Sequence, residues 1–158
     1  MSDVAEKMTV REKLINHEYK LSIGGNLERS KTTFDVLNPA TNEVIAQAPE
    51  ADSAQMEKAI SAAKEAFESW SSLEWAIRSD YIHKFADALD ERKEELATLL
   101  TLEQGKPLNT MAIDEVGAAI HWVREVAKRR LEVEEIENTD EHIVEVHHTP
   151  LGVVGAIT

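Results

Sequence analysis

An apolar stripe at helical spacing runs through the middle of the sequence and constrains the fold more than any other feature. Hydrophobic residues recur every three or four positions from Met56 to Leu100, as in helices that bury one face. Asp52, with Gln55 three residues later, fits a capping box that begins the first helix. Because the stretch is too long for a typical helix, we expect a break or kink near Asp90.

Further signals mark where these helices begin and end. Gly105 and Pro107 predict the end of the helical region, because glycine accepts a left-handed conformation and proline cannot continue a helix. Ser71, with Glu74 three residues on, predicts a second cap inside the region. The apolar spacing then predicts one more helix over about residues 109–130.

Short β segments precede the helices. Residues 19–23, 32–37 and 44–46 have the alternation or composition of strands. Glycines in residues 24–26 supply a turn, and the Pro and Asn of residues 38–42 supply a reversal. We therefore expect a small antiparallel meander.

The pattern changes again after the helices. Residues 132–141 are acidic and are predicted to form a solvated connection, and residues 142–148 alternate as a strand does. After Pro150, the apolar residues 151–157 are a candidate for a buried strand. Residues 1–18 lack clear periodicity, so we expect a frayed arm or a short helix there. The residues alone thus predict a soluble, acidic α+β chain.

Charge and composition exclude several classes of function. The 158 residues contain 17 Lys and Arg against 30 Asp and Glu, which gives a formal net charge of −13. This surplus repels phosphate backbones and anionic lipid, so neither a nucleic-acid nor a membrane partner is expected. The beginning of the chain does not resemble a secretory signal, and we expect a cytoplasmic protein. With no cysteine, the chain has neither disulfides nor a thiolate nucleophile.

Few residues carry recognisable chemistry. The six histidines have no metal-ligand spacing, and the neighbours His147 and His148 face opposite sides of their predicted strand. Lys106 lacks the glycine-rich loop of a phosphate-binding lysine, and Gly152 and Gly155 do not form a dinucleotide-binding signature. Three aromatic residues at helical positions are predicted to lie in a core or an interface: Trp70, Trp75 and Trp122.

Five blocks, taken in order, nevertheless resemble a known family. They are the N-P-A-T-N-E-V-I-A of residues 38–46, the alanine-rich helix of residues 59–70, the R-x-x-x-I-x-x-x-A-D-x-L of residues 78–89, the E-Q-G-K-P-L of residues 103–108 with Glu115-Val116 after it, and the P-L-G-V-V-G-A-I-T of residues 150–158. Their motifs and order are similar to the N-terminal portion of NAD(P)-dependent aldehyde dehydrogenases. The likeness extends from about Tyr19 to the last residue.

This resemblance implies an α/β fold, namely an incomplete N-terminal part of a Rossmann-like coenzyme-binding domain. Residues 1–18 would be an N-terminal arm, and residues 19–141 would form the meander and three or four helices of that domain. Residues 142–149 would be a strand of the oligomerisation arm. Residues 150–158 would be the truncated first strand of the nucleotide-binding sheet.

Site residues are implied only by the same resemblance. Ile157 and Thr158 correspond to the start of the loop that contacts NAD or NADP, although we do not expect this chain to bind the coenzyme alone. Val36, Leu37 and Glu103 would lie near a structural monovalent-cation site of some members. The family's nucleophilic Cys, its base Glu and its oxyanion-binding Asn have no counterpart within these residues, so we assign neither a catalytic residue nor a metal ligand.

Two functional hypotheses follow from the resemblance. The chain is the N-terminal fragment of an enzyme that oxidises an aldehyde to a carboxylate, and is inactive alone. Alternatively, it is an interaction or regulatory module that pairs through its arm strand with full-length subunits. Its expected partner is therefore another copy of the chain or a full-length homologous subunit. A generic acidic helical adaptor would leave the ordered motifs unexplained.

Overall fold

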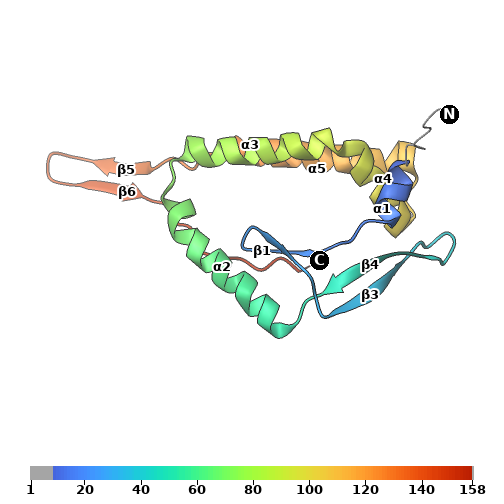
Figure 1. Cartoon of the computed structure of the whole chain (residues 1–158). Coiled ribbons are helices and arrows are strands. Elements are labelled where there is room, and N and C mark those ends of the chain that lie inside the picture. The colour runs from blue at the N-terminus through green and yellow to red at the C-terminus, as the bar shows by residue number, and fades with distance from the viewer. Residues whose placement is uncertain (1–8, 158) are drawn as a thin grey trace, which may run out of the picture.

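The structure is a computed structural model that describes residues 9–157. A short helix and two hairpins come first, the longer helices follow, and a third hairpin comes after them. The elements follow along the chain in this order, and most of them are labelled in Figure 1: α1 (Val10–Ile15), β1 (Leu21–Ile23), β2 (Asn26–Glu28), β3 (Thr32–Leu37), β4 (Val44–Glu50), α2 (Ser53–Ser72), α3 (Trp75–Glu91), α4 (Lys93–Gln104), the π-helical turn η1 (Leu108–Ala112), α5 (Ile113–Ala127), β5 (Glu134–Asn138) and β6 (Ile143–Val146). The mixture of helices and strands agrees with the predicted class.

The strands before the helices form two separate antiparallel hairpins rather than one meander. β1 pairs with β2 and β3 pairs with β4, and no pairing joins the two hairpins within residues 9–157. The predicted meander is therefore wrong. Gly24 and Gly25 both have positive φ values, 56° and 78°, and close a two-residue turn. The chain thus returns directly along β1, which makes β2 a strand that the sequence did not predict.

Helix α2 begins as the sequence predicts. Asp52 accepts a hydrogen bond from the backbone N–H of Gln55 at 2.9 Å, and the Gln55 side chain returns the contact, which completes the capping box. The second predicted cap is wrong. Ser71 donates instead to the carbonyl of Glu68, inside α2, and Glu74 precedes α3 without a side-chain cap.

The helical region breaks and ends where the sequence predicts. Arg92 separates α3 from α4 with φ −108° and ψ 14°, which confirms the expected break near Asp90. Gly105 ends α4 in the left-handed conformation, with φ 75°, and its N–H bonds to the carbonyl of Thr101. The last predicted helix is also present, as η1 followed by α5.

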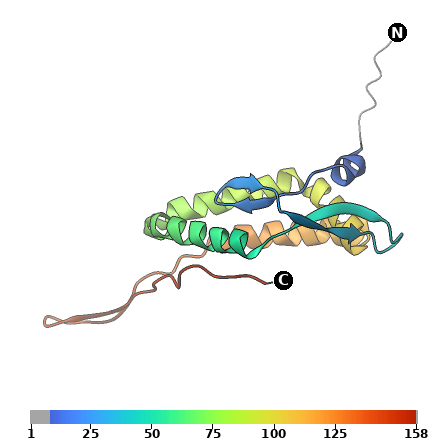
Figure 2. The same cartoon turned by 60° about the horizontal axis from the view of Figure 1, so that its bottom comes forward.

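The chain buries only a small core. Leu14, Ile45 and Leu102 meet where α1, β4 and α4 come together. The helices α3 and α5 lie side by side in Figures 1 and 2, whereas α2 leads away from them and has no buried residue. The accessible surface is 12607 Å². A compact monomer of this size would expose about 7,900 Å², so much of the surface remains open.

Residues 150–157 do not form a strand here. They have no regular structure, and Leu151 and Ile157 are 99% and 100% exposed. The prediction of a buried strand therefore fails for this chain, because no neighbouring strand within the described part of the chain is available to pair with it. Its assignment to a nucleotide-binding sheet stays a prediction. Across residues 9–157, no helix is both long enough and apolar enough to cross a membrane.

Candidate functional site

A hairpin projects from one end of the α3–α5 pair and is the clearest candidate for a functional surface (Figure 1). We call residues 134–146, which comprise β5, β6 and their turn, the arm. Glu134 lies opposite Val146 and Asn138 opposite Ile143, with a register shift between Glu135 and Glu137. Every residue of both strands is exposed. The arm therefore makes little use of its side chains for packing within the chain.

The turn of the arm is held by Thr139. Its hydroxyl oxygen accepts hydrogen bonds from the backbone N–H groups of Glu141 and His142, at 3.3 and 3.1 Å. The backbone N–H of Thr139 in turn donates to the carbonyl of His142 at 2.9 Å. These local bonds close the arm without any contribution from the rest of the protein.

Like charges face each other across the arm. Glu135 lies directly opposite Glu145, an arrangement that destabilises a strand pair. Each carboxylate has a local polar partner: Asn138 donates to Glu135 at 2.9 Å, and His147 Nε2 lies 2.9 Å from Glu145. Residues 134–138 are exposed, as a solvated segment is, but they form strand β5 rather than the predicted connection. The apolar Ile136 among three glutamates is too weak a signal to predict a strand there.

The arm offers free backbone edges. Because it contains only two strands within residues 9–157, each strand has one side whose N–H and C=O groups lack a strand partner. Such an edge can accept a further strand through main-chain hydrogen bonds. The arrangement therefore suits pairing with another polypeptide.

The assignment of Ile157 and Thr158 to the loop that contacts the coenzyme stays a prediction. Ile157 is fully exposed at the end of the unpaired segment, and Thr158 lies outside the described residues. Of the residues expected near a monovalent-cation site, Val36 packs against the small core, whereas Leu37 and Glu103 are exposed. Among residues 9–157 no three His, Asp or Glu side chains gather closely enough to hold a metal ion.

The other residues that the sequence analysis considered either form structural contacts or are exposed. Lys106 forms an ion pair with Glu115 of α5, beside the turn that ends α4. The histidines His147 and His148 are exposed. Trp70 and Trp122 are 40% and 60% exposed, so neither belongs to a core, and their placement in an interface stays a prediction.

A hollow of about 390 Å³ lies between α1 and α4, and neither the arm nor residues 150–157 line it. Its apolar lining comes from Leu14, Leu96 and Leu99, and Tyr19 also borders it. Burial, followed by the nearby carboxylates of Glu95 and Glu103, raises the pKa of Tyr19. The Tyr19 hydroxyl already donates to the carbonyl of Leu14 at 3.1 Å, so it acts as a structural link.

Comparison with known proteins identifies the family to which this fold belongs. The sequence profile of the aldehyde dehydrogenase family matches residues 27–158. A putative aldehyde dehydrogenase of Bacillus subtilis, DhaS, is 35% identical over 99% of this chain and 33% of its own length. A probable NADP⁺-dependent succinate-semialdehyde dehydrogenase of Sinorhizobium fredii is 36% identical over 87% of this chain and 28% of its own.

Solved structures agree with the sequence relatives. The NAD⁺ complex of an aldehyde dehydrogenase from Bacillus cereus aligns with a TM-score of 0.84 and 32% identity, over 92% of this chain and 31% of that one. The betaine aldehyde dehydrogenase of Staphylococcus aureus in complex with NAD⁺ aligns with a TM-score of 0.75 and 30% identity, over 82% and 27%. The chain belongs to the aldehyde dehydrogenase family, and it spans about a third of the length of DhaS.

Proposed function

We propose that this chain is the N-terminal part of an NAD(P)-dependent aldehyde dehydrogenase subunit. The observation that carries the proposal is the state of residues 150–157, which are apolar, extended beyond the last strand and exposed. An apolar segment of this kind is stabilised when it is inserted between strands of a larger sheet. The family match extends through this segment, to residue 158.

In this role the chain supplies support and assembly. The helices would cover one side of the coenzyme domain, the arm would pair with another subunit, and residues 150–158 would form the first strand of the nucleotide-binding sheet. Ile157 and Thr158 would then border NAD or NADP. Ile157 is fully exposed at the end of an unpaired segment and does not enclose a dinucleotide, so we do not expect the isolated chain to bind it.

The isolated chain is expected to be inactive. The reaction of the family begins with attack of a cysteine thiolate on the aldehyde carbon, and the coenzyme, when bound, accepts the hydride that leaves the resulting adduct. The 158 residues contain no cysteine. They can orient neighbouring elements but cannot form that covalent bond.

Complementation tests this proposal. The chain is co-expressed with the part of DhaS that follows the matched third, and the formation of NADH or NADPH from an aldehyde is measured. Neither piece alone should be active, whereas the pair should oxidise the aldehyde. Coenzyme-dependent oxidation by the chain alone, or failure of the soluble pair to associate, would overturn the proposal.

The exposed edges of the arm support a second candidate function, that of a module which pairs with full-length subunits and regulates them. The chain should then co-purify with intact DhaS. Ile143→Lys should weaken that association, because a charge on an edge strand opposes strand addition, and Lys64→Gln on α2 serves as the control. A cytoplasmic location stays a prediction from the sequence, which cell fractionation checks.

A further inference from the structure

The C-terminal end of α5 receives unusual support. The last carbonyls of an α-helix have no partner within the helix and must find one elsewhere. In α5, the carbonyls of Glu125 and Val126 accept bonds from the backbone N–H groups of Lys128 and Arg129, at 3.3 and 3.0 Å. These two bonds are local. The carbonyls of Ala127 and Arg129 accept bonds from a different helix.

Two side chains of α3 supply those bonds. The hydroxyl of Ser79 donates to the carbonyl of Ala127 at 2.7 Å, and the indole Nε1–H of Trp75 donates to the carbonyl of Arg129 at 3.0 Å. Trp75 and Ser79 are four residues apart in the first turns of α3, so they lie on the same face of that helix. The two carbonyls that accept these bonds lie at the point where the chain leaves α5.

Burial makes one of these bonds difficult to replace with water. Ser79 is 9% exposed and Ala127 is 2% exposed. A buried carbonyl that loses its donor keeps the full cost of desolvation. The other bond is reinforced by charge, because the guanidinium carbon of Arg130 lies 5.8 Å from the centre of the Trp75 ring, within the range of a cation–π contact.

We infer that Trp75 and Ser79 act together as a clamp that fixes the direction in which the arm leaves the helix pair. Residues 129–133, which join α5 to β5, have no regular structure. Without the clamp, rotation along this connection would point the arm in many directions. With it, Arg129 and Arg130 are held against α3, and only residues 131–133 separate the held point from the arm. Figure 1 shows the arm continuing from this end of the pair.

The clamp is a conformational device, and the hydrogen bonds that form it do not depend on the proposed function. Its effect on the pairing of subunits does rest on that function. An arm that already points in one direction loses less rotational freedom on pairing than one that must first be ordered. Trp75 and Ser79 are therefore positioning residues for the arm.

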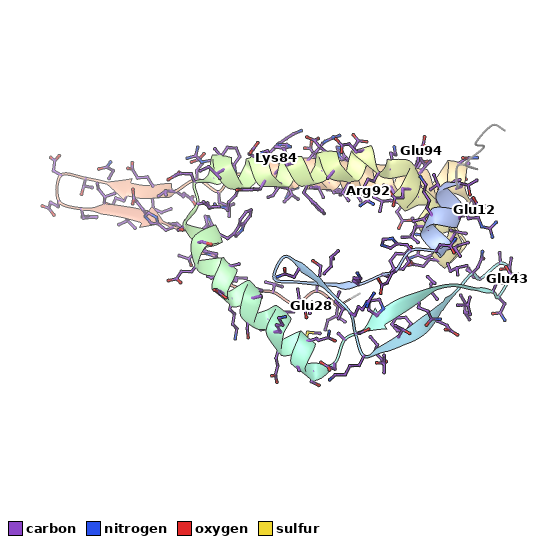
Figure 3. The ribbon with its side chains drawn as sticks, in the orientation of Figure 1. Glu12, Glu28, Glu43, Lys84, Arg92 and Glu94 are labelled. Atoms are coloured by element: carbon purple, nitrogen blue, oxygen red, sulfur yellow. The ribbon has the colours of Figure 1, made fainter. Side chains whose placement is uncertain are left out.

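Distances between paired spin labels test the clamp directly. The absence of cysteine makes specific labelling simple. One label is attached through Lys84→Cys on α3, whose position Figure 3 labels, and the other through Asp140→Cys in the turn of the arm. Pulsed dipolar spectroscopy of the full chain should give one narrow distance distribution. Trp75→Phe, which keeps an aromatic ring but removes the N–H donor, should broaden it.

Controls separate the clamp from general loosening. Trp70→Phe makes the same chemical change on α2, where the ring lies 5.9 Å from that of Tyr81, and should leave the distribution narrow. Ser79→Ala removes the second bond and should broaden it without loss of helical circular dichroism. A broad distribution in the parent chain, or a narrow one in both Trp75→Phe and Ser79→Ala, would overturn the inference. No outcome depends on enzymatic activity.

Discussion

Glu18 shows how single charges tie the segment before β1 to the hairpin that follows it. Its two carboxylate oxygens accept bonds from the guanidinium of Arg29 at 2.6 and 3.1 Å, and the ammonium of Lys20 lies 3.2 Å away. The bonds from Arg29 and then Lys20 lower the pKa of Glu18 from 4.5 to about 2. A depressed pKa means that the ion pairs stabilise the fold fully above pH 4.5, and that this contribution is lost as the pH falls towards 2.

Arg29→Gln should therefore raise the pKa of Glu18 towards 4.5, because the guanidinium that donates two hydrogen bonds to the carboxylate is removed. A carboxyl titration followed by NMR measures the midpoint. Lys13→Gln on α1 removes a cation that lies outside these ion pairs, and it should leave the midpoint in place. A midpoint that stays near 2 in Arg29→Gln would show that this carboxylate is held by something else.

Gly105 is a residue whose role follows from backbone conformation. Its φ is 75°, and a Cβ placed there would lie 2.9 Å from Cγ of Pro39. Gly105→Ala should lower the free energy of unfolding by at least about 1–2 kcal/mol, which is the cost of a left-handed non-glycine residue before any steric conflict. Urea denaturation measures the loss. Gly155→Ala is the control, because a Cβ at Gly155 meets nothing within 4 Å.

At the scale of elements, the helices were largely predictable and the strands only in part. The Asp52–Gln55 box and the Gly105 stop are local, since each is defined by residues within a few positions of one another. The failed cap at Ser71 shows the limit of such motifs, because a serine near the end of a helix can bond back to its own turn instead.

The strands failed for a different reason. β2 depends on how tightly Gly24 and Gly25 turn, and β5 depends on the pairing of a strongly acidic segment with β6. Neither the tightness of the turn nor the pairing of the acidic segment can be predicted from hydrophobic alternation. The same limit applies to the candidate site: the sequence pointed to the strand of residues 142–148, but not to its partner, nor to the contact of Trp75 with the end of α5.

Charge repulsion across the arm can be relieved without loss of a hydrogen-bond acceptor. Glu135→Gln keeps an oxygen for Asn138 but removes the charge opposite Glu145. The change should stabilise the arm by about 0.2–1 kcal/mol, the usual size of a cross-strand pair term. Amide hydrogen exchange of β5 and β6 at neutral pH measures the gain. Glu141→Gln in the turn serves as the control, and equal protection in both variants would contradict the argument.

At the scale of the whole molecule, the open surface is the dominant property. The accessible area is 12607 Å², whereas a compact monomer of this size would expose about 7,900 Å². The difference between these two areas is larger than the area that many obligate interfaces bury. The formal charge of −13 opposes association of like chains, whereas the exposed apolar side chains favour it. We expect a chain that is poorly soluble or dependent on a partner.

Residues 150–157 should contribute strongly to that behaviour. Val154→Lys places a charge in the unpaired segment, where Val154 is 75% exposed, and should increase the monomer fraction measured by sedimentation velocity. Leu27→Lys in β2 replaces a side chain that is 72% exposed and changes the net charge equally. It should have the smaller effect, because its strand is already paired. An equal effect of both variants would mean that added charge alone governs self-association.

The clamp between α3 and α5 also has a consequence for the order of events during translation. Trp75, Ser79 and the carbonyls they hold all precede residue 130, whereas the arm begins at residue 134. Since elements made first can fold while synthesis continues, the helix pair can close before the arm has left the ribosome. The arm would then emerge beside a helix pair that is already closed.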